Sequence, residues 1–132
     1  MPQQRGQPKK IQYHWEIDAY KLSVSAAMEI YELSKSFPDE EKYSLTDQIR
    51  KSSRSISGQI AEGWRRRKYR AAFVNKMNEA EAEAAETQAW LEYCAKCQYI
   101  SKEAYTDLHY KYQEIIGKII NMGNHPEQWC LS

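Results

Sequence analysis

Apolar residues recur at helical spacing along most of this 132-residue chain. Successive apolar positions lie three or four residues apart, which places them on one face of an α-helix. The pattern predicts four helices, over about residues 15–37, 44–64, 69–98 and 101–124. Short connections between helices favour antiparallel neighbours. The sequence therefore predicts an all-α protein, built as an antiparallel up-down four-helix bundle.

The first predicted helix, which should stop at Pro38, carries two apolar stripes. At about 100° per residue, the centres of these stripes lie about 150° apart. A helix in a lone bundle buries one stripe, so the second predicts contact with another subunit. Either stripe suits that role. The first consists of Ala19, Leu22, Ala26, Ile30, Leu33 and Phe37, and the second consists of Ile17, Tyr20, Val24, Ala27, Met28 and Tyr31. Within the second stripe, the residues taken here as the oligomer interface are Ile17, Tyr20, Val24, Met28 and Tyr31.

The other three helices each carry one inward stripe. We expect a capping box of Ser44 and Asp47 to start the second helix, Gly63 to end it, and Ser101 to cap the fourth. Small residues on the second helix would let another backbone approach closely. The inward stripes are Leu45, Ile49, Ser52, Ser53, Ile56 and Ile60; Phe73, Met77, Ala80, Ala84, Thr87, Leu91 and Cys94; and Tyr105, Leu108, Tyr112, Ile115, Ile116, Ile119 and Met122.

The length of the chain allows one domain with one core. We expect a flexible basic N-terminal arm over residues 1–14, the bundle over 15–124 and a C-terminal tail over 125–132. No run approaches the roughly 18 to 20 apolar residues of a membrane span, and the N-terminus lacks the apolar stretch of a signal peptide. These features predict a cytoplasmic protein without membrane contact, whose cysteines stay thiols.

Positive charge is concentrated where the second helix meets the third. Residues 50–76 contain nine Lys and Arg residues against Glu62 alone, a net charge of +8 in a chain whose total is +1. Several cations on one surface bind polyanions by releasing the counterions condensed on phosphates. Trp64 and Tyr69 flank the run and are candidates for stacking on bases. The predicted nucleic-acid contacts are Arg50, Lys51, Arg54, Arg65, Arg66, Arg67, Lys68 and Arg70.

A second interpretation of these cations carries equal weight. They would form a solvated turn between two helices, paired with Glu62 or with the acidic third helix of a neighbouring subunit. Which interpretation holds depends on where the carboxylates lie in the folded protein.

The sequence contains no recognisable catalytic or metal-binding pattern. A di-metal site in a bundle needs Glu-x-x-His pairs, and none of His14, His109 and His125 follows a Glu at that spacing. Cys94 and Cys97 fall near a predicted helix C-terminus, where the dipole raises thiol pKa, so packing is favoured over redox or zinc chemistry. There is no nucleophile motif and no phosphate-binding glycine loop. We expect a protein that is not an enzyme and that uses no metal and no cofactor.

Two segments carry a family resemblance. Residues 47–64, DQIRKSSRSISGQIAEGW, and residues 31–38, YELSKSFP, resemble the four-helix-bundle proteins encoded in intervening sequences of bacterial large-subunit ribosomal RNA genes. The likeness covers about residues 17–100 and departs at Gly58, where such proteins often carry a polar or small residue. It implies a homopentameric barrel. A related branch, the accessory subunits of diversity-generating retroelements, binds a reverse transcriptase and its template RNA.

Together these observations predict a non-catalytic homo-oligomer, a pentamer by resemblance, that binds RNA or DNA through the basic junction of the second and third helices. The alternative is a protein-interaction scaffold, such as the accessory subunit of a diversity-generating retroelement reverse transcriptase, in which the same cations bind an acidic protein surface.

Overall fold

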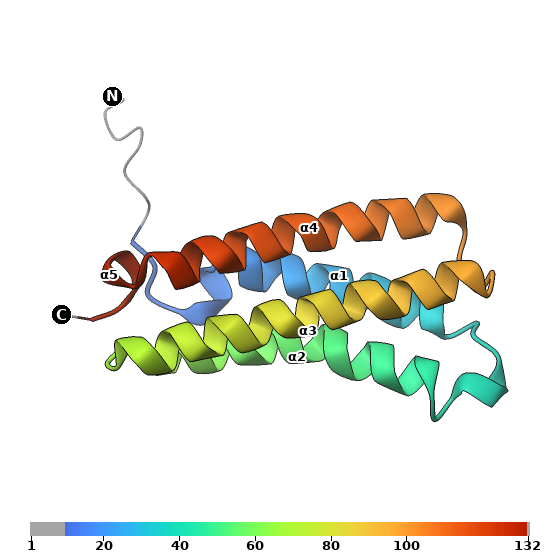
Figure 1. The fold of residues 1–132 in the computed structure, drawn as a ribbon, viewed down its shortest axis with the longest axis horizontal. Coiled ribbons are helices and arrows are strands. Elements are labelled where there is room, and N and C mark those ends of the chain that lie inside the picture. Colours follow the sequence, from blue (N-terminus) through green and yellow to red (C-terminus); the bar gives the residue numbers. More distant parts are fainter. Residues whose placement is uncertain (1–9, 132) are drawn as a thin grey trace.

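The computed structural model describes residues 10–131, and these form helices without strands. Four long helices lie side by side, each antiparallel to the next, as an up-down bundle (Figure 1). This confirms the predicted all-α bundle, whereas assembly into a pentameric barrel stays a prediction. Most of the predicted N-terminal arm lies outside the described residues. The elements are the 3-10 helix η1 (His14–Glu16), α1 (Asp18–Ser34), the 3-10 helix η2 (Asp39–Glu41), α2 (Leu45–Arg65), α3 (Arg70–Lys96), α4 (Lys102–Asn124) and α5 (Pro126–Trp129).

The core forms where the inward stripes of the long helices meet. Every residue of the stripes predicted on α2 and α3 is buried. On α4, Tyr105 and Ile116 are half-buried and the other predicted positions are buried. Two polar members of these stripes satisfy each other, since the Thr87 hydroxyl donates to the Ser52 hydroxyl oxygen at 2.8 Å in a buried hydrogen bond between α2 and α3. The helical spacing of apolar residues therefore identified the packing faces of these three helices.

Helix α1 is shorter at both ends than predicted. It follows η1, and it ends at Ser34, after which the Phe37 N–H donates to the Ser34 carbonyl oxygen at 3.1 Å. That turn brings the Phe37 ring to within 5.5 Å of the Tyr99 ring, centroid to centroid, and leaves Phe37 only 9% exposed. The tertiary contact of Phe37 thus closes the helix before the steric limit at Pro38 is reached.

The start of α2 is held by Glu41 and not by the predicted capping box. The carboxylate of Glu41 accepts hydrogen bonds from the Ser44 hydroxyl at 2.6 Å and from the Leu45 N–H at 3.3 Å. Asp47 instead pairs with Lys51 at 3.0 Å. Hydrogen bonds from Ser44 and then Tyr99 lower the pKa of Glu41, which keeps a negative charge at the positive end of the helix dipole. By contrast, Ser101 caps α4 as predicted, accepting from the Ala104 N–H at 3.0 Å.

Gly63 lies inside α2 and does not end it, contrary to the prediction. A Cβ at this position would stand 2.5 Å from the Met77 terminal methyl carbon and 3.1 Å from the Lys76 Cβ. The missing side chain therefore permits the close approach of α2 and α3 that the small residues predicted. Gly58 differs, because a Cβ there would meet nothing within 4 Å.

Helix α3 ends two residues earlier than predicted, whereas α4 ends at Asn124 as predicted. Helix α3 stops at Lys96, and Gln98 takes a left-handed conformation with φ of 64°. The Tyr99 N–H then donates to the Cys94 carbonyl oxygen at 2.8 Å, which closes a Schellman-type turn. After α4, Pro126 starts the short helix α5, in the segment predicted to be a tail. Among residues 10–131, no helix combines the length and apolar character needed to cross a bilayer.

The two glycines of α2 provide a matched test of this packing. Gly63→Val should lower the free energy of unfolding by about 2 to 3 kcal/mol, because its side chain overpacks the contact with Met77 and Lys76. Gly58→Ala should raise it by about 0.5 to 1 kcal/mol, through helix propensity at an open site. Chemical denaturation followed by circular dichroism measures both changes, and a Gly63→Val variant as stable as the wild type would contradict the assignment.

Candidate nucleic-acid interface

Three parts of the chain that are distant in sequence meet at one end of the bundle. The α2–α3 turn, the segment around η1 and the short α5 all lie at that end (Figure 1). The Leu131 N–H donates to the Arg67 carbonyl oxygen at 3.1 Å, so the C-terminal residues brace the turn. The basic residues of the turn are therefore presented on a supported surface.

Four cations of this turn are exposed to solvent. We call Arg65, Arg66, Lys68 and Arg70 the turn cluster. Within residues 10–131, the structure records no ion pair for any of the four. Unpaired, solvated cations keep their full field for a polyanion.

Glu62, the carboxylate expected to neutralise the turn, is directed elsewhere. It pairs with Lys76 of α3 at 2.9 Å, and Lys76 also contacts Glu79 at 3.1 Å. The hydrogen bond from Lys76 and, more weakly, the nearby charge of Arg66 lower the pKa of Glu62. Within the single chain, the interpretation that pairs the turn with Glu62 is therefore not realised. Pairing with a neighbouring subunit stays a prediction.

Arg67 and Trp64 contact each other and stabilise the turn. The sequence predicted instead that Arg67 contacts nucleic acid and that Trp64 stacks on a base. The Arg67 guanidinium carbon lies 3.4 Å from the Trp64 ring centroid, and its Nε donates to the Trp64 carbonyl oxygen at 2.7 Å. Burial lowers the pKa of Arg67. Trp64 is only 4% exposed, so its ring is not accessible to a base. The prediction of base stacking by Trp64 is wrong, because the indole completes the core beneath the turn.

Tyr69 remains available for stacking. Its side chain is 64% exposed, and the Lys68 ammonium lies 5.8 Å from the ring centroid. An exposed aromatic ring next to an exposed cation is a combination found in sites for single-stranded nucleic acid.

The basic residues in the first half of α2 form a separate group. The Arg50 Nε donates to the Ser34 hydroxyl at 2.8 Å, and the guanidinium groups of Arg50 and Arg54 lie 5.0 and 5.4 Å from the Tyr31 ring centroid. Lys51 pairs with Asp47. Fifteen residues of helix separate Arg50 from Arg65, which corresponds to about 22 Å. The predicted eight-residue surface is thus divided into the turn cluster and a group already engaged within the chain.

Acidic residues of α3 also face this second group. Arg50, Lys51 and Arg54 share a groove with Glu83 and Glu86 between the two helices. Burial, followed by the charge of Glu86, raises the pKa of Glu83. These carboxylates reduce the electrostatic field of the α2 cations, which therefore differ from the turn cluster in charge environment as well as in position.

The stripe predicted as the oligomer interface is only partly exposed. Ile17 is 1% exposed and belongs to the core of its own chain, so its assignment to the interface is wrong. Tyr20 and Tyr31 are half-buried, whereas Val24 and Met28 remain 37% and 51% exposed. The core side of α1 follows the first stripe, in which Ala19, Ala26 and Ile30 are each 1% exposed, and it extends over the buried Ser23 and Ser34. The hydroxyls of these two serines donate to the carbonyl oxygens of Tyr20 and Tyr31, three residues earlier in each case.

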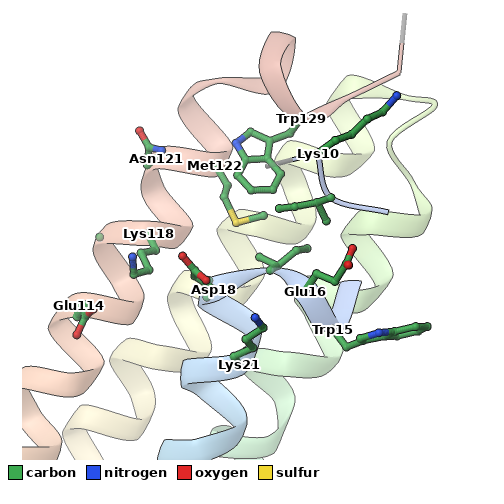
Figure 2. Close-up of a pocket in the computed structure, with 14 residues that line it drawn as sticks. Lys10, Trp15, Glu16, Asp18, Lys21, Glu114, Lys118, Asn121, Met122 and Trp129 are labelled. Carbon is green, nitrogen blue, oxygen red and sulfur yellow. The ribbon is translucent and has the colours of Figure 1, made fainter. Parts of the chain in front are cut away.

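A large cavity lies near the same end of the bundle and has mixed chemistry. It measures about 970 Å³ and lies between the segment around η1, the start of α1 and the end of α4. Figure 2 shows Lys21 and Lys118 beside Asp18 and Glu114, with the Trp129 indole and Met122 above them. No group of three or more His, Cys, Asp and Glu side chains in the described part of the chain is placed to hold a metal ion. The alternating charges do not select a polyanion.

The two cysteines of the Cys-x-x-Cys pair differ in environment. Cys94 is buried, and burial raises the pKa of its thiol to about 12, while Cys97 is exposed. A thiol with so high a pKa is a poor nucleophile at neutral pH. This supports the interpretation of Cys94 as a packing residue.

Sequence reasoning misses two exposed aromatic residues beside the turn cluster. Tyr13 and Trp15 are 49% and 55% exposed, and their rings stack with centroids 4.5 Å apart. The helical pattern assigns Tyr13 to the N-terminal arm and Trp15 to the start of the first helix. The available signal is a pair of aromatic residues two positions apart, immediately before the first helical stripe and outside its periodicity.

Comparisons with known proteins agree with the resemblance of residues 31–38 and 47–64. A family model described as 23S rRNA-intervening sequence protein matches residues 16–121. The fold is similar to a crystal structure from Bacteroides thetaiotaomicron, described as a protein with unknown function from the S23 ribosomal protein family. The two chains are 32% identical with a TM-score of 0.71, and the match covers 80% of this chain and 95% of that one. No curated protein matches this chain.

Alanine substitutions of two neighbouring arginines of the turn should change the free energy of unfolding by different amounts. Arg67→Ala should lower the free energy of unfolding by about 1 to 3 kcal/mol, because it removes the stacking on Trp64 and the hydrogen bond to its carbonyl oxygen. Arg66→Ala should change it by no more than about 0.5 kcal/mol. Urea denaturation of the two variants tests the assignment, and equal effects would show that Arg67 has no structural role.

Proposed function

This chain belongs to the 23S rRNA-intervening sequence protein family, and we propose that it is a non-catalytic homo-oligomer that binds RNA through the turn cluster. In this proposal Arg65, Arg66, Lys68 and Arg70 contact phosphates, and Tyr69 contacts a base. The second group of α2 cations, which the sequence-based prediction includes, takes no direct part because its members are engaged within the chain.

The absence of carboxylate partners around the turn cluster, within the described residues, is the observation that carries the proposal. A solvated turn between two helices is stable without four unpaired cations. The mutual repulsion of the four cations favours the binding of an anionic partner. Binding to phosphates relieves that repulsion and releases condensed counterions. RNA is the preferred polyanion in this proposal because the family description refers to 23S rRNA.

Self-association would increase the affinity for RNA that a small basic surface can provide. Val24 and Met28 on α1 are exposed, and Met28 borders a shallow depression of about 520 Å³ that includes Leu33, Ala104 and Leu108. Exposed apolar side chains on a bundle helix, beside a depression that Glu29, Glu32 and Asp107 also line, are suited to packing against a second copy. Each additional subunit brings another turn cluster, so binding to a long RNA becomes multivalent.

RNA binding is tested with two variants of equal net charge. In the first, R65A/R66A/K68A/R70A, the turn cluster is removed. In the second, four exposed lysines at the opposite end of the bundle are replaced, in K35A/K42A/K96A/K102A (Figure 1). We expect the first variant to reduce the slope of log Kobs against log salt by about 0.7 for each phosphate of single-stranded RNA that the protein no longer neutralises. The second variant should retain the wild-type slope. Fluorescence anisotropy at several salt concentrations measures both.

Equal losses of affinity in the two variants would show that net charge, and not the turn cluster, controls binding. A wild-type protein that binds no RNA at low salt would reject the proposal. The cations would then favour an acidic protein surface, as in the scaffold alternative with a reverse transcriptase as partner.

Self-association is tested separately by light scattering. The wild type should give a mass that is a multiple of 15.6 kDa. V24E/M28E should give the mass of a single chain with an unchanged helical circular dichroism spectrum, because both side chains are solvent-exposed within the chain. Tyr43→Glu is the control, since Tyr43 is 84% exposed and lies in the connection between η2 and α2, outside the predicted interface stripe. A wild-type mass of one subunit in dilute neutral buffer would contradict the prediction.

A further inference from the structure

An open groove lies between the segment around η1 and the C-terminal end of α2. Its volume is about 690 Å³, and the exposed aromatic pair of Tyr13 and Trp15 lies on the η1 side, with Glu62, Arg65 and Arg66 on the α2 side. Two members of the turn cluster thus form a wall of a groove whose opposite wall is aromatic.

The aromatic wall is pre-organised. The rings of Tyr13 and Trp15 are nearly parallel, with an interplanar angle of 2°, and the His14 ring meets Trp15 edge-on at 5.1 Å. The Glu16 carboxylate accepts hydrogen bonds from the backbone N–H groups of Gln12 at 2.7 Å and Tyr13 at 3.0 Å, which fixes the segment. Little conformational entropy remains to be lost when a ligand binds to rings that are already ordered.

Trp15 lines both the groove and the mixed-charge cavity. In Figure 2 its indole extends away from Asp18, Lys21 and Lys118. Tyr13 is absent from the residues that line that cavity and is present among those that line the groove. The stacked pair therefore belongs to the same surface as Arg65 and Arg66.

The charge of the groove is positive in spite of Glu62. The Glu62 carboxylate is compensated by Lys76 at 2.9 Å, whereas Arg65 and Arg66 have no carboxylate partner among the described residues. A flat apolar surface opposite unpaired guanidinium groups is complementary to a nucleotide, whose base has a π-face and whose phosphate is anionic.

We propose that this groove binds an unpaired nucleotide of single-stranded RNA, with the base stacked on the Tyr13–Trp15 pair and an adjacent phosphate at Arg65 and Arg66. The inference rests on the proposed RNA-binding function and specifies its substrate class. Bases in a duplex are already stacked on each other, so an aromatic wall selects unpaired segments such as loops and ends.

The test compares full-length Trp15→Ala with the wild type on two probes of equal length, a 12-nucleotide single-stranded RNA and a counterpart that lacks every base. Trp15→Ala should weaken binding of the complete strand by at least about fivefold, since stacking contributes about 1 to 3 kcal/mol per base. Binding of the abasic strand should be unchanged, because it depends on phosphates alone. Trp15→Phe should restore most of the affinity. Tyr43→Ala, an exposed aromatic residue at the opposite end of the bundle, is the control and should match the wild type.

The outcomes separate this inference from the proposed function. Loss of binding in the turn-cluster variant together with wild-type affinity in Trp15→Ala would overturn the stacking site and leave RNA binding intact. Absence of salt-sensitive binding by the wild type would overturn both. A change of subunit number in Trp15→Ala, seen by light scattering, would also overturn the inference, because it would assign the aromatic pair to a subunit interface.

Discussion

The close packing of α2 against α3 determines where the charged groups of this protein lie. Gly63 lacks the Cβ that would collide with Lys76 and Met77, so Lys76 can lie against α2 and pair with Glu62. In that pair Lys76 compensates the charge of Glu62, the only carboxylate in the segment 50–76. Among the described residues, the exposed arginines of the turn are therefore unpaired as a consequence of helix packing, and not only because basic residues are abundant there.

The arginines of α2 and the following turn serve two different purposes. Arg50, Arg54 and Arg67 lie over aromatic rings, where a planar, weakly hydrated guanidinium packs better than a lysine ammonium would. Arg65 and Arg66 project into solvent. In this basic segment, the arginines that lie over an aromatic ring therefore have a structural role. The arginines that project into solvent remain available to a binding partner.

One end of the bundle collects the features on which the proposed RNA binding rests. The turn, the stacked pair before α1 and the residues after α5 come from three distant segments, and they meet because an up-down bundle places alternate helix ends together (Figure 1). The opposite end carries Glu41 and the connections α1–α2 and α3–α4, where hydrogen bonds serve helix capping. This division gives the molecule one chemically distinct end.

The sequence by itself determined the helices and most of their packing faces, because the burial of apolar side chains imposes a helical period that is visible in Phe73, Met77, Ala80 and Ala84. It also located the basic turn and the family segment. Only the tertiary structure decided that Trp64 is buried, that Arg67 stacks on it, that Ile17 belongs to the core and that Tyr13 and Trp15 flank the turn. Those outcomes depend on contacts between segments far apart in the chain, and the spacing of residues within one helix carries no information about them.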